Sequence, residues 1–225
     1  MTFPNCLFLD HTVTMPAWTH LIRFKAVEDG QVHLGQLVDT SRDVGVDSVS
    51  GSTIKAYLIN GDVFNGVVTD KVYTVSHLLS PIAREQCNYI RCLGLNYKDH
   101  AAEGGFPIPE ELEVFTKPRT ALIGPYPEAV TIPKCAQDGS SDYEAELCVV
   151  IGKTGRDISV DDALDYVLGF TACNDISARS LQLKVKEDFP IHSGCSAKSK
   201  NNSLIQNSRQ AIVKVIHTQT FIEKG

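Results

Sequence analysis

The sequence predicts a mostly β protein of the α+β class, with a small N-terminal domain ahead of a larger unit. Short alternating or apolar runs, which are typical of strands, are separated by turn residues from 18 to 75. The most strand-like run of the chain, 143–151, lies in the second half. Helix-like patterns are short and end at glycines, as at Gly104 and Gly169.

The first 85 residues are expected to form the small β-rich domain. Ile54 and Leu58 stand at helical spacing, so a helical turn is predicted at 53–59, before the break at 60–62. Strands are predicted at 20–24, 32–38 and 72–79.

The second unit, 86–199, is predicted to alternate strands with short helical turns. One helical turn is expected at 98–103, and another opens at Ser159, which forms a capping box with Asp162. From residue 200 the composition turns to Asn, Ser, Gln and Lys, which predicts a polar tail over 200–225. Strands are predicted at 89–93, 114–117, 120–123, 143–151, 170–173 and 211–216.

Composition and charge exclude several kinds of partner. The chain is 43% hydrophobic and 21% charged, which is typical of a globular protein. Its net charge is −6 and it has no basic stripe, so nucleic acid is not an expected partner. No apolar run approaches the roughly 18 residues that span a bilayer. The N-terminus lacks a signal-peptide core, and the seven cysteines form no C-x-x-C pair, so a cytoplasmic protein with reduced thiols is expected.

Two carboxylates share one face of the most strand-like run. Glu144 and Glu146 are two residues apart, so their side chains point to the same side of a strand, about 7 Å apart. Like charges this close repel, and burying them without a cation is costly. A hard divalent metal with oxygen ligands resolves the repulsion. Taken alone, such a pair more often marks a solvated strand face.

Asp175 follows the strand 170–173 and supplies a third candidate ligand. A carboxylate at a strand end completes a facial set of three oxygens around Mg²⁺ or Mn²⁺, with water filling the remaining positions. The alternative is that Asp175 caps a helix that begins near Ser177. The hypothesis is therefore a divalent-metal site of Glu144, Glu146 and Asp175.

His100 and Glu103 form a second candidate group. A short helix places both on one face, where the carboxylate orients the imidazole and raises its basicity. Such a pair suits a general base acting on water, whereas an isolated His–Glu pair is more often a surface contact. The turn at Asn96 can approach a ligand closely. Further polar residues near these elements that can hold a carboxylate are Lys117, Arg179 and Gln182.

Four motifs, in this order and spacing, resemble the fumarylacetoacetate hydrolase family over about 88–182. The first 85 residues resemble the small N-terminal domain of its two-domain members. The matching segments are 92–97 with His100 and Glu103, 115–118, 142–153 and 174–179.

The resemblance implies a twisted β-roll in which Glu144, Glu146 and Asp175 hold Mg²⁺, or Mn²⁺ or Ca²⁺ in its place. It implies a 1,3-dicarbonyl or 2-oxo-acid substrate, of the fumarylacetoacetate or acylpyruvate type, that chelates the metal. His100 and Glu103 are then expected to activate the water that attacks a carbonyl before the C–C bond breaks. Gln182 and Lys198 match substrate-contacting positions.

Other activities and a dimer also follow from the resemblance. Relatives include oxaloacetate decarboxylases, isomerases and hydratases, and a fold analogy cannot choose among them. The family tends to form dimers, so a homodimer is expected if the roll is completed.

The sequence departs from the family after Ser199. The family continues into closing strands and a Gly-Thr-Pro substrate loop, whereas this chain continues with the polar tail. Missing strands leave open sheet edges, so a truncated or alternatively read form with an incomplete roll is expected. Two functions stay open. One is the metal-dependent hydrolase, and the other is an inactive fragment that only binds metal or another subunit.

Overall fold

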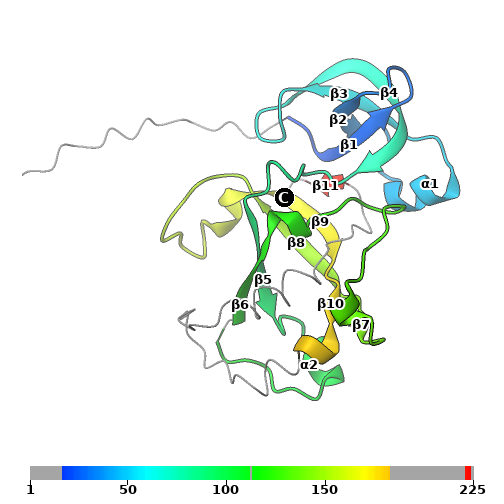
Figure 1. Cartoon of the computed structure of the whole chain (residues 1–225). Helices are drawn as coiled ribbons and strands as arrows, with labels where there is room; N and C mark the ends of the chain where they lie inside the picture. Colours follow the sequence, from blue (N-terminus) through cyan, green and yellow to red (C-terminus); the bar gives the residue numbers. More distant parts are fainter. Residues whose placement is uncertain (1–16, 112, 183–220, 224–225) are drawn as a thin grey trace, which may run out of the picture.

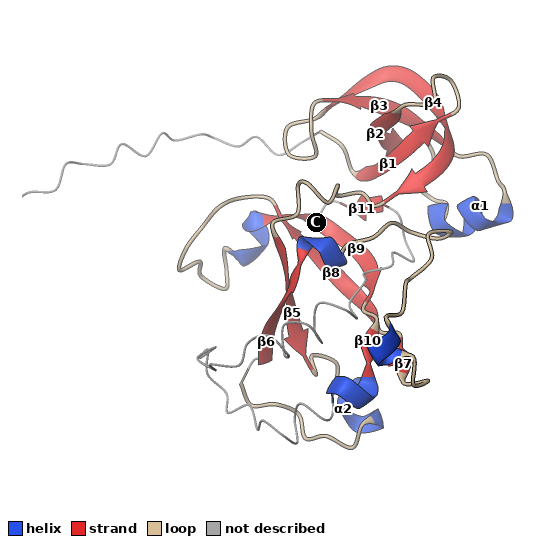
Figure 2. Ribbon diagram, viewed as in Figure 1, coloured by secondary structure: helices blue, strands red, loops and turns tan. Residues whose placement is uncertain are grey.

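A computed structural model describes residues 17–111, 113–182 and 221–223 of the 225-residue chain. The prediction of a mostly β fold is confirmed, since strands dominate the ribbon in Figure 2. The strands are β1 His20–Ala26, β2 Val32–Leu37, β3 Lys55–Asn60, β4 Val67–Leu79, β5 Tyr89–Gly94, β6 Glu113–Pro118, β7 Ser141–Asp142, β8 Ala145–Ile151, β9 Val167–Asn174, β10 Ser177–Ala178 and β11 Phe221–Glu223. The α-helices are α1 Val44–Ser50 and α2 Lys98–Glu103, and 3₁₀ helices span Arg119–Ala121, Lys134–Ala136 and Ala163–Tyr166.

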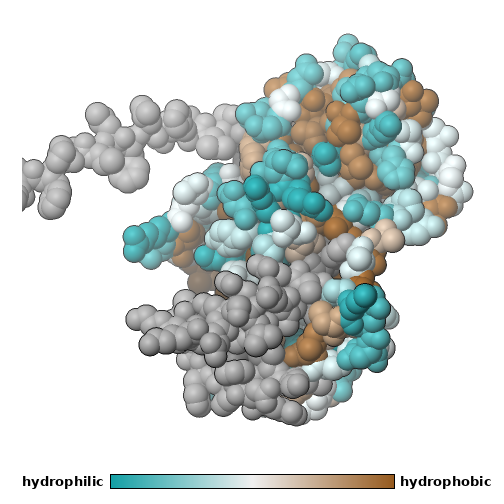
Figure 3. Space-filling model, in the orientation of Figure 1, coloured by the Kyte–Doolittle hydropathy of each residue, from teal (hydrophilic) through white to brown (hydrophobic). Residues whose placement is uncertain are grey.

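The first four strands close into a ring around the first part of the core. β1 pairs with β2 along its length and with β4 through its second half, and β3 joins β2 to β4. Ile22, Phe24 and Ala56 are fully buried inside this ring. Gly35 on β2 leaves room for them, because a Cβ there would lie 2.7 Å from Ala56 and 2.8 Å from the Phe24 ring. The surface of this part mixes apolar and polar patches (Figure 3).

One seven-stranded sheet connects the ring with the second half of the chain (Figure 1). Its order is β2-β3-β4-β1-β11-β9-β8, so β11 lies between β1 and β9. A second apolar cluster fastens the same connection, because Trp18 and Leu21 pack with Leu168 of β9. The Trp18 indole also donates a hydrogen bond to the Val63 carbonyl at 3.2 Å. The domain boundary near residue 85 stays a prediction.

The structure corrects two local predictions. Residues 53–59 do not form a helical turn, because most of them lie in β3. Ile54 and Leu58 are four residues apart, a spacing that also fits one face of a strand, and both are buried there with Ala56 between them. The run 120–123 begins in a 3₁₀ helix rather than a strand. The strand expected at 211–216 lies outside the described residues.

Helix α1 was not anticipated from the sequence, although its signals are local ones. The Asp43 carboxylate accepts hydrogen bonds from the backbone N–H groups of Gly45 and Val46 at 2.9 and 3.1 Å. Gly51 ends the helix with φ +75°, a left-handed conformation that favours glycine. Within the described residues, no helix is long and apolar enough to cross a membrane.

The ring core yields a stability prediction. Phe24→Ala is expected to lower the free energy of unfolding by about 3–5 kcal/mol, because the fully buried ring leaves a cavity. Val49→Ala is the control, since Val49 is 67% exposed and its loss is expected to change stability by less than about 0.5 kcal/mol. Urea unfolding measures both. Equal effects of the two substitutions would contradict the assigned core.

Candidate metal and catalytic site

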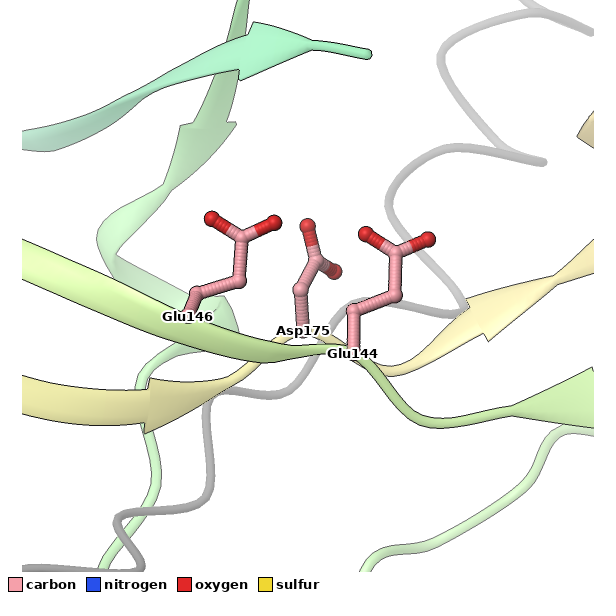
Figure 4. A group of neighbouring side chains, drawn as sticks. All are labelled: Glu144, Glu146 and Asp175. Carbon is pink, nitrogen blue, oxygen red and sulfur yellow. The ribbon is translucent and has the colours of Figure 1, made fainter. Parts of the chain in front are cut away.

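Antiparallel pairing of β8 with β9 brings the three predicted metal ligands together. Glu146 is opposite Cys173, and the Asp175 N–H donates to the Glu144 carbonyl at 2.8 Å. Glu144 and Asp175 are thus the next pair along the same face. Figure 4 shows the three carboxylates side by side, all pointing to one side of the two strands. The Glu144 N–H donates a hydrogen bond to the Asn174 side-chain oxygen at 3.1 Å, and this bond fixes the end of β8.

The three carboxylates form a compact set of oxygen donors, here called the carboxylate group. One oxygen from each of Glu144, Glu146 and Asp175 lies within 4.8 Å of the other two. Bonds of about 2.0–2.6 Å to a hard divalent cation allow a single ion to reach all three oxygens. Oxygen-only donors suit Mg²⁺, Mn²⁺ or Ca²⁺ rather than a thiophilic metal. The residues present therefore fit the expected cation.

Electrostatic strain accompanies this arrangement. Burial, together with the charges of Asp175 and Glu144, raises the pKa of Glu146 to about 7. Burial also raises the pKa of Asp175, which is only 6% exposed, although the Lys117 ammonium opposes the rise. Carboxylic acids with raised pKa values in a cluster of like charges favour either a proton or a cation between them.

Two cationic side chains flank the carboxylate group. Lys117 on β6 is 4% exposed and forms an ion pair with Asp175. Arg179 forms an ion pair with Glu144 and another with Asp142, whose carboxylate lies 3.0 Å away. The Arg179 guanidinium also donates to the Gln182 amide oxygen at 3.2 Å. Three residues predicted to contact substrate thus lie at the site. Lys117 and Arg179 bind its carboxylates, and Gln182 binds Arg179.

Helix α2 lies next to β8 through a residue that sequence reasoning did not single out. The Tyr97 hydroxyl, at the residue before α2, accepts a hydrogen bond from the Leu147 N–H at 3.0 Å. Leu147 directly follows Glu146, so this contact sets α2 beside the carboxylate group. Nothing in the sequence pattern marks this hydroxyl, because its partner is a backbone group 50 residues away.

The structure places both His100 and Glu103 on α2. His100 is half-buried, Glu103 is exposed, and the described part of the chain shows no hydrogen bond between their side chains. Burial acts to raise the pKa of Asp142, but hydrogen bonds from Arg179 and Tyr143, with a smaller effect of the His100 charge, lower it overall. The partnership of His100 with Glu103 stays a prediction.

Asn96 and Lys198 are the remaining candidates for contact with substrate. Asn96 is exposed in the turn between β5 and α2, next to Leu95. Leu95 has φ +50°, which leucine adopts rarely, so the surrounding structure holds this turn in place. Lys198 lies outside the described residues.

Comparison with family models decides the relationship. The model of the fumarylacetoacetate (FAA) hydrolase C-terminal domain matches residues 89–205. The chain belongs to the fumarylacetoacetate hydrolase family. A caffeoylpyruvate hydrolase of Neonothopanus nambi is 42% identical over an alignment 222 positions long, which covers 92% of this chain and 76% of that protein.

Other family members match smaller parts of the chain or share only the fold. A mitochondrial oxaloacetate tautomerase of Homo sapiens is 42% identical over 106 residues, 47% of this chain and 32% of that protein. The 5-carboxymethyl-2-hydroxymuconate delta-isomerase structure from Mycobacterium smegmatis has a TM-score of 0.56 and 28% identity, covering 73% of this chain and 58% of that one. The 2-hydroxyhepta-2,4-diene-1,7-dioate isomerase from Mycobacterium marinum shares the fold at TM-score 0.59 and 22% identity, covering 92% of this chain and 66% of that one.

The raised pKa of Glu146 predicts that the stability of the chain depends on pH when a chelator such as EDTA keeps it free of metal. The folded chain binds this proton more tightly than the unfolded chain. The contribution of the protonated Glu146 to the free energy of unfolding is therefore complete below its ordinary pKa of 4.5. It is lost as pH rises through about 7. At pH 8, Glu146→Gln is expected to raise the free energy of unfolding by about 1–3 kcal/mol. At pH 5 it is expected to change little.

Urea unfolding at both pH values measures this effect. Glu110→Gln is the matched control, because Glu110 is exposed and is not one of the three carboxylates. A gain for Glu146→Gln of the same size at pH 5 and pH 8 would contradict the assigned pKa.

Proposed function

We propose that this chain is a metal-dependent hydrolase that cleaves a C–C bond in an acylpyruvate-type substrate. The observation that carries the proposal is the carboxylate group, whose oxygens lie within 4.8 Å of one another between two cationic side chains. The similarity of this chain to a caffeoylpyruvate hydrolase, over 92% of its length, supports an acylpyruvate as substrate. The reaction adds water to the acyl carbonyl and releases a carboxylic acid and pyruvate.

Glu144, Glu146 and Asp175 are the residues that hold the cation, Mg²⁺ or Mn²⁺. A bound divalent ion supplies Lewis-acid stabilisation of negative charge on the oxygens of the dicarbonyl substrate. The chain supplies the orientation of these ligands. Lys117 holds the Asp175 carboxylate and Arg179 holds that of Glu144, so neither ligand is free to rotate away.

The two cations also adjust the charge of the site. Three carboxylates facing one another repel strongly, and the ammonium and guanidinium groups offset part of that repulsion without occupying every oxygen. Arg179 is itself fixed by Asp142, and its planar fork suits a carboxylate. We therefore assign Arg179, with Gln182 beside it, to the end of the site that receives the substrate carboxylate.

Proton transfer is assigned to helix α2. His100 accepts a proton from the attacking water on a ring nitrogen, and Glu103 stabilises the imidazolium that results. Since Glu103 and His100 are three residues apart on the same helix, a change of side-chain rotamer brings the exposed Glu103 carboxylate to His100. Gly104 and Gly105 directly after α2 leave the helix free to close over the site when substrate binds.

A tautomerase is the second candidate, favoured by the 42% identity to the human oxaloacetate tautomerase over 47% of the chain. A tautomerase shifts a proton between carbon and oxygen of a 2-oxo acid without adding water. It needs the carboxylate group and one acid–base residue, but no activated water. Acylpyruvate cleavage and oxaloacetate keto–enol conversion, followed in parallel on one preparation, separate the two activities.

Metal binding gives the direct test of the carboxylate group. Glu144→Gln is expected to weaken Mn²⁺ binding by roughly tenfold or more, because it removes one anionic ligand. Calorimetric titration of the full chain measures the affinity, with Glu110→Gln as the matched control. Equal affinity in both variants would reject these residues as the metal site. Binding without turnover of either substrate would instead support an inactive metal-binding chain.

The role of His100 is tested by separating chemistry from metal binding. His100→Gln is expected to lower kcat for acylpyruvate cleavage by roughly 10²–10⁴-fold and to leave Mn²⁺ affinity unchanged. A smaller loss of kcat for oxaloacetate conversion than for acylpyruvate cleavage would show that His100 acts in the step that adds water. A parallel loss of Mn²⁺ binding would mean that His100 supports the fold of the site instead of its chemistry.

A further inference from the structure

Two thiols lie directly behind the carboxylate group, on the same face of β8 and β9. Cys148 is two residues after Glu146 on β8, and Cys173 is paired with Glu146 across the strands. The two cysteines are therefore diagonal neighbours on one face of the paired strands. Both are free and half-buried. Metal binding by the carboxylate group gives neither of them a role.

A buried hydroxyl faces the same pair. Thr171 is directly opposite Cys148 and its side chain is almost fully buried, at 5% exposure. Its Oγ1 has no hydrogen-bond partner among the residues that the structure describes. Buried polar atoms without a partner are rare and cost free energy. Thiols are weak acceptors, so Cys148 opposite Thr171 leaves this hydroxyl poorly satisfied.

The strand geometry favours chelation by the two thiols over a disulfide. Diagonal neighbours in an antiparallel pair have Cα atoms about 7–8 Å apart, but a disulfide requires about 4.4–6.8 Å. A thiophilic atom with bonds of about 2.3 Å to sulfur spans two sulfurs about 4 Å apart without moving the backbone. The paired strands hold the two side chains in one orientation, so little conformational entropy is lost on binding.

We propose that Cys148 and Cys173 form a dithiol site for thiophilic ligands, namely trivalent arsenicals and soft divalent cations. The site lies next to Glu146, which is on the same strand face as both sulfurs. A bulky group held by the two sulfurs occupies space beside that carboxylate. Loading the dithiol site therefore weakens the binding of a hard cation to the carboxylate group.

Phenylarsine oxide is the probe for the dithiol site. It condenses with two thiols to form two As–S bonds, and its oxygen leaves as water with the two thiol protons, so no oxidant takes part. The reduced full-length chain is treated with one equivalent, and native mass spectrometry counts the phenylarsenic groups. Alkylation of the remaining thiols, followed by peptide mapping, shows which cysteines are protected. One group per chain is expected, with Cys148 and Cys173 protected.

Variants and a matched control sharpen the assignment. Cys148→Ser and Cys173→Ser are each expected to abolish uptake, whereas Cys135→Ser, at an exposed cysteine, retains it. Protection of a different pair would overturn the proposal, for example one that includes Cys92, which is also free and half-buried. The alkylation map of the unsubstituted chain decides this point even if a variant does not fold.

The coupling to the carboxylate group has its own measurement. Mn²⁺ affinity, followed by the electron paramagnetic resonance signal of the free ion, is expected to fall several-fold when the arsenical is bound. It is expected to recover when 2,3-dimercaptopropanol removes the arsenical. Unchanged affinity would overturn the coupling. Arsenical uptake does not depend on catalysis, so a failure of the proposed hydrolase activity leaves this test intact.

Discussion

The register of β8 against β9 is the constraint on which the site depends. In an antiparallel pair a slip of one residue moves every side chain of a strand to the opposite face. The observed register places Glu146 opposite Cys173 and lets the Asp175 N–H bond to the Glu144 carbonyl. A slip by one residue would separate Asp175 from both glutamates. The apolar residues on the far face of β8, Leu147 and Val149, would then face Asp175 in place of the two glutamates.

This register also creates the electrostatic cost that the neighbouring elements offset. Burial, together with the two neighbouring carboxylates, raises the pKa of Glu146 to about 7, and the buried Lys117 offsets part of the charge on Asp175. A lysine at 4% exposure is itself expensive to desolvate, so its burial is tolerable only beside an anion. Lys117 and the carboxylate group therefore each lower the cost of burying the other. The ion pair of Lys117 with Asp175 therefore connects the strand pair β5–β6 to the β8–β9 pair.

The sequence predicted the parts of the site that follow from local periodicity. The shared face of Glu144 and Glu146 follows from the two-residue repeat of a strand, and helix α2 was predicted with its observed bounds. The position of Asp175 opposite Glu144 depends on a register between distant strands, which no single segment encodes. The same limit explains the error at 53–59, because a spacing of four residues fits both a helix face and a strand face. Only the surrounding ring, with Ile54 and Leu58 in its core, decides between them.

The sheet order adds a mechanical consequence. β9 is an inner strand, paired on one side with β8 and on the other with β11, which leads to the N-terminal ring. β8 is the last strand of this sheet within the described residues, so one edge of it is open there. Edge strands are held by one ladder of hydrogen bonds instead of two. A cation bound by Glu144 and Glu146 of the β8 segment and Asp175 after β9 would tie this edge to the inner strand, so metal binding adds directly to the stability of the sheet.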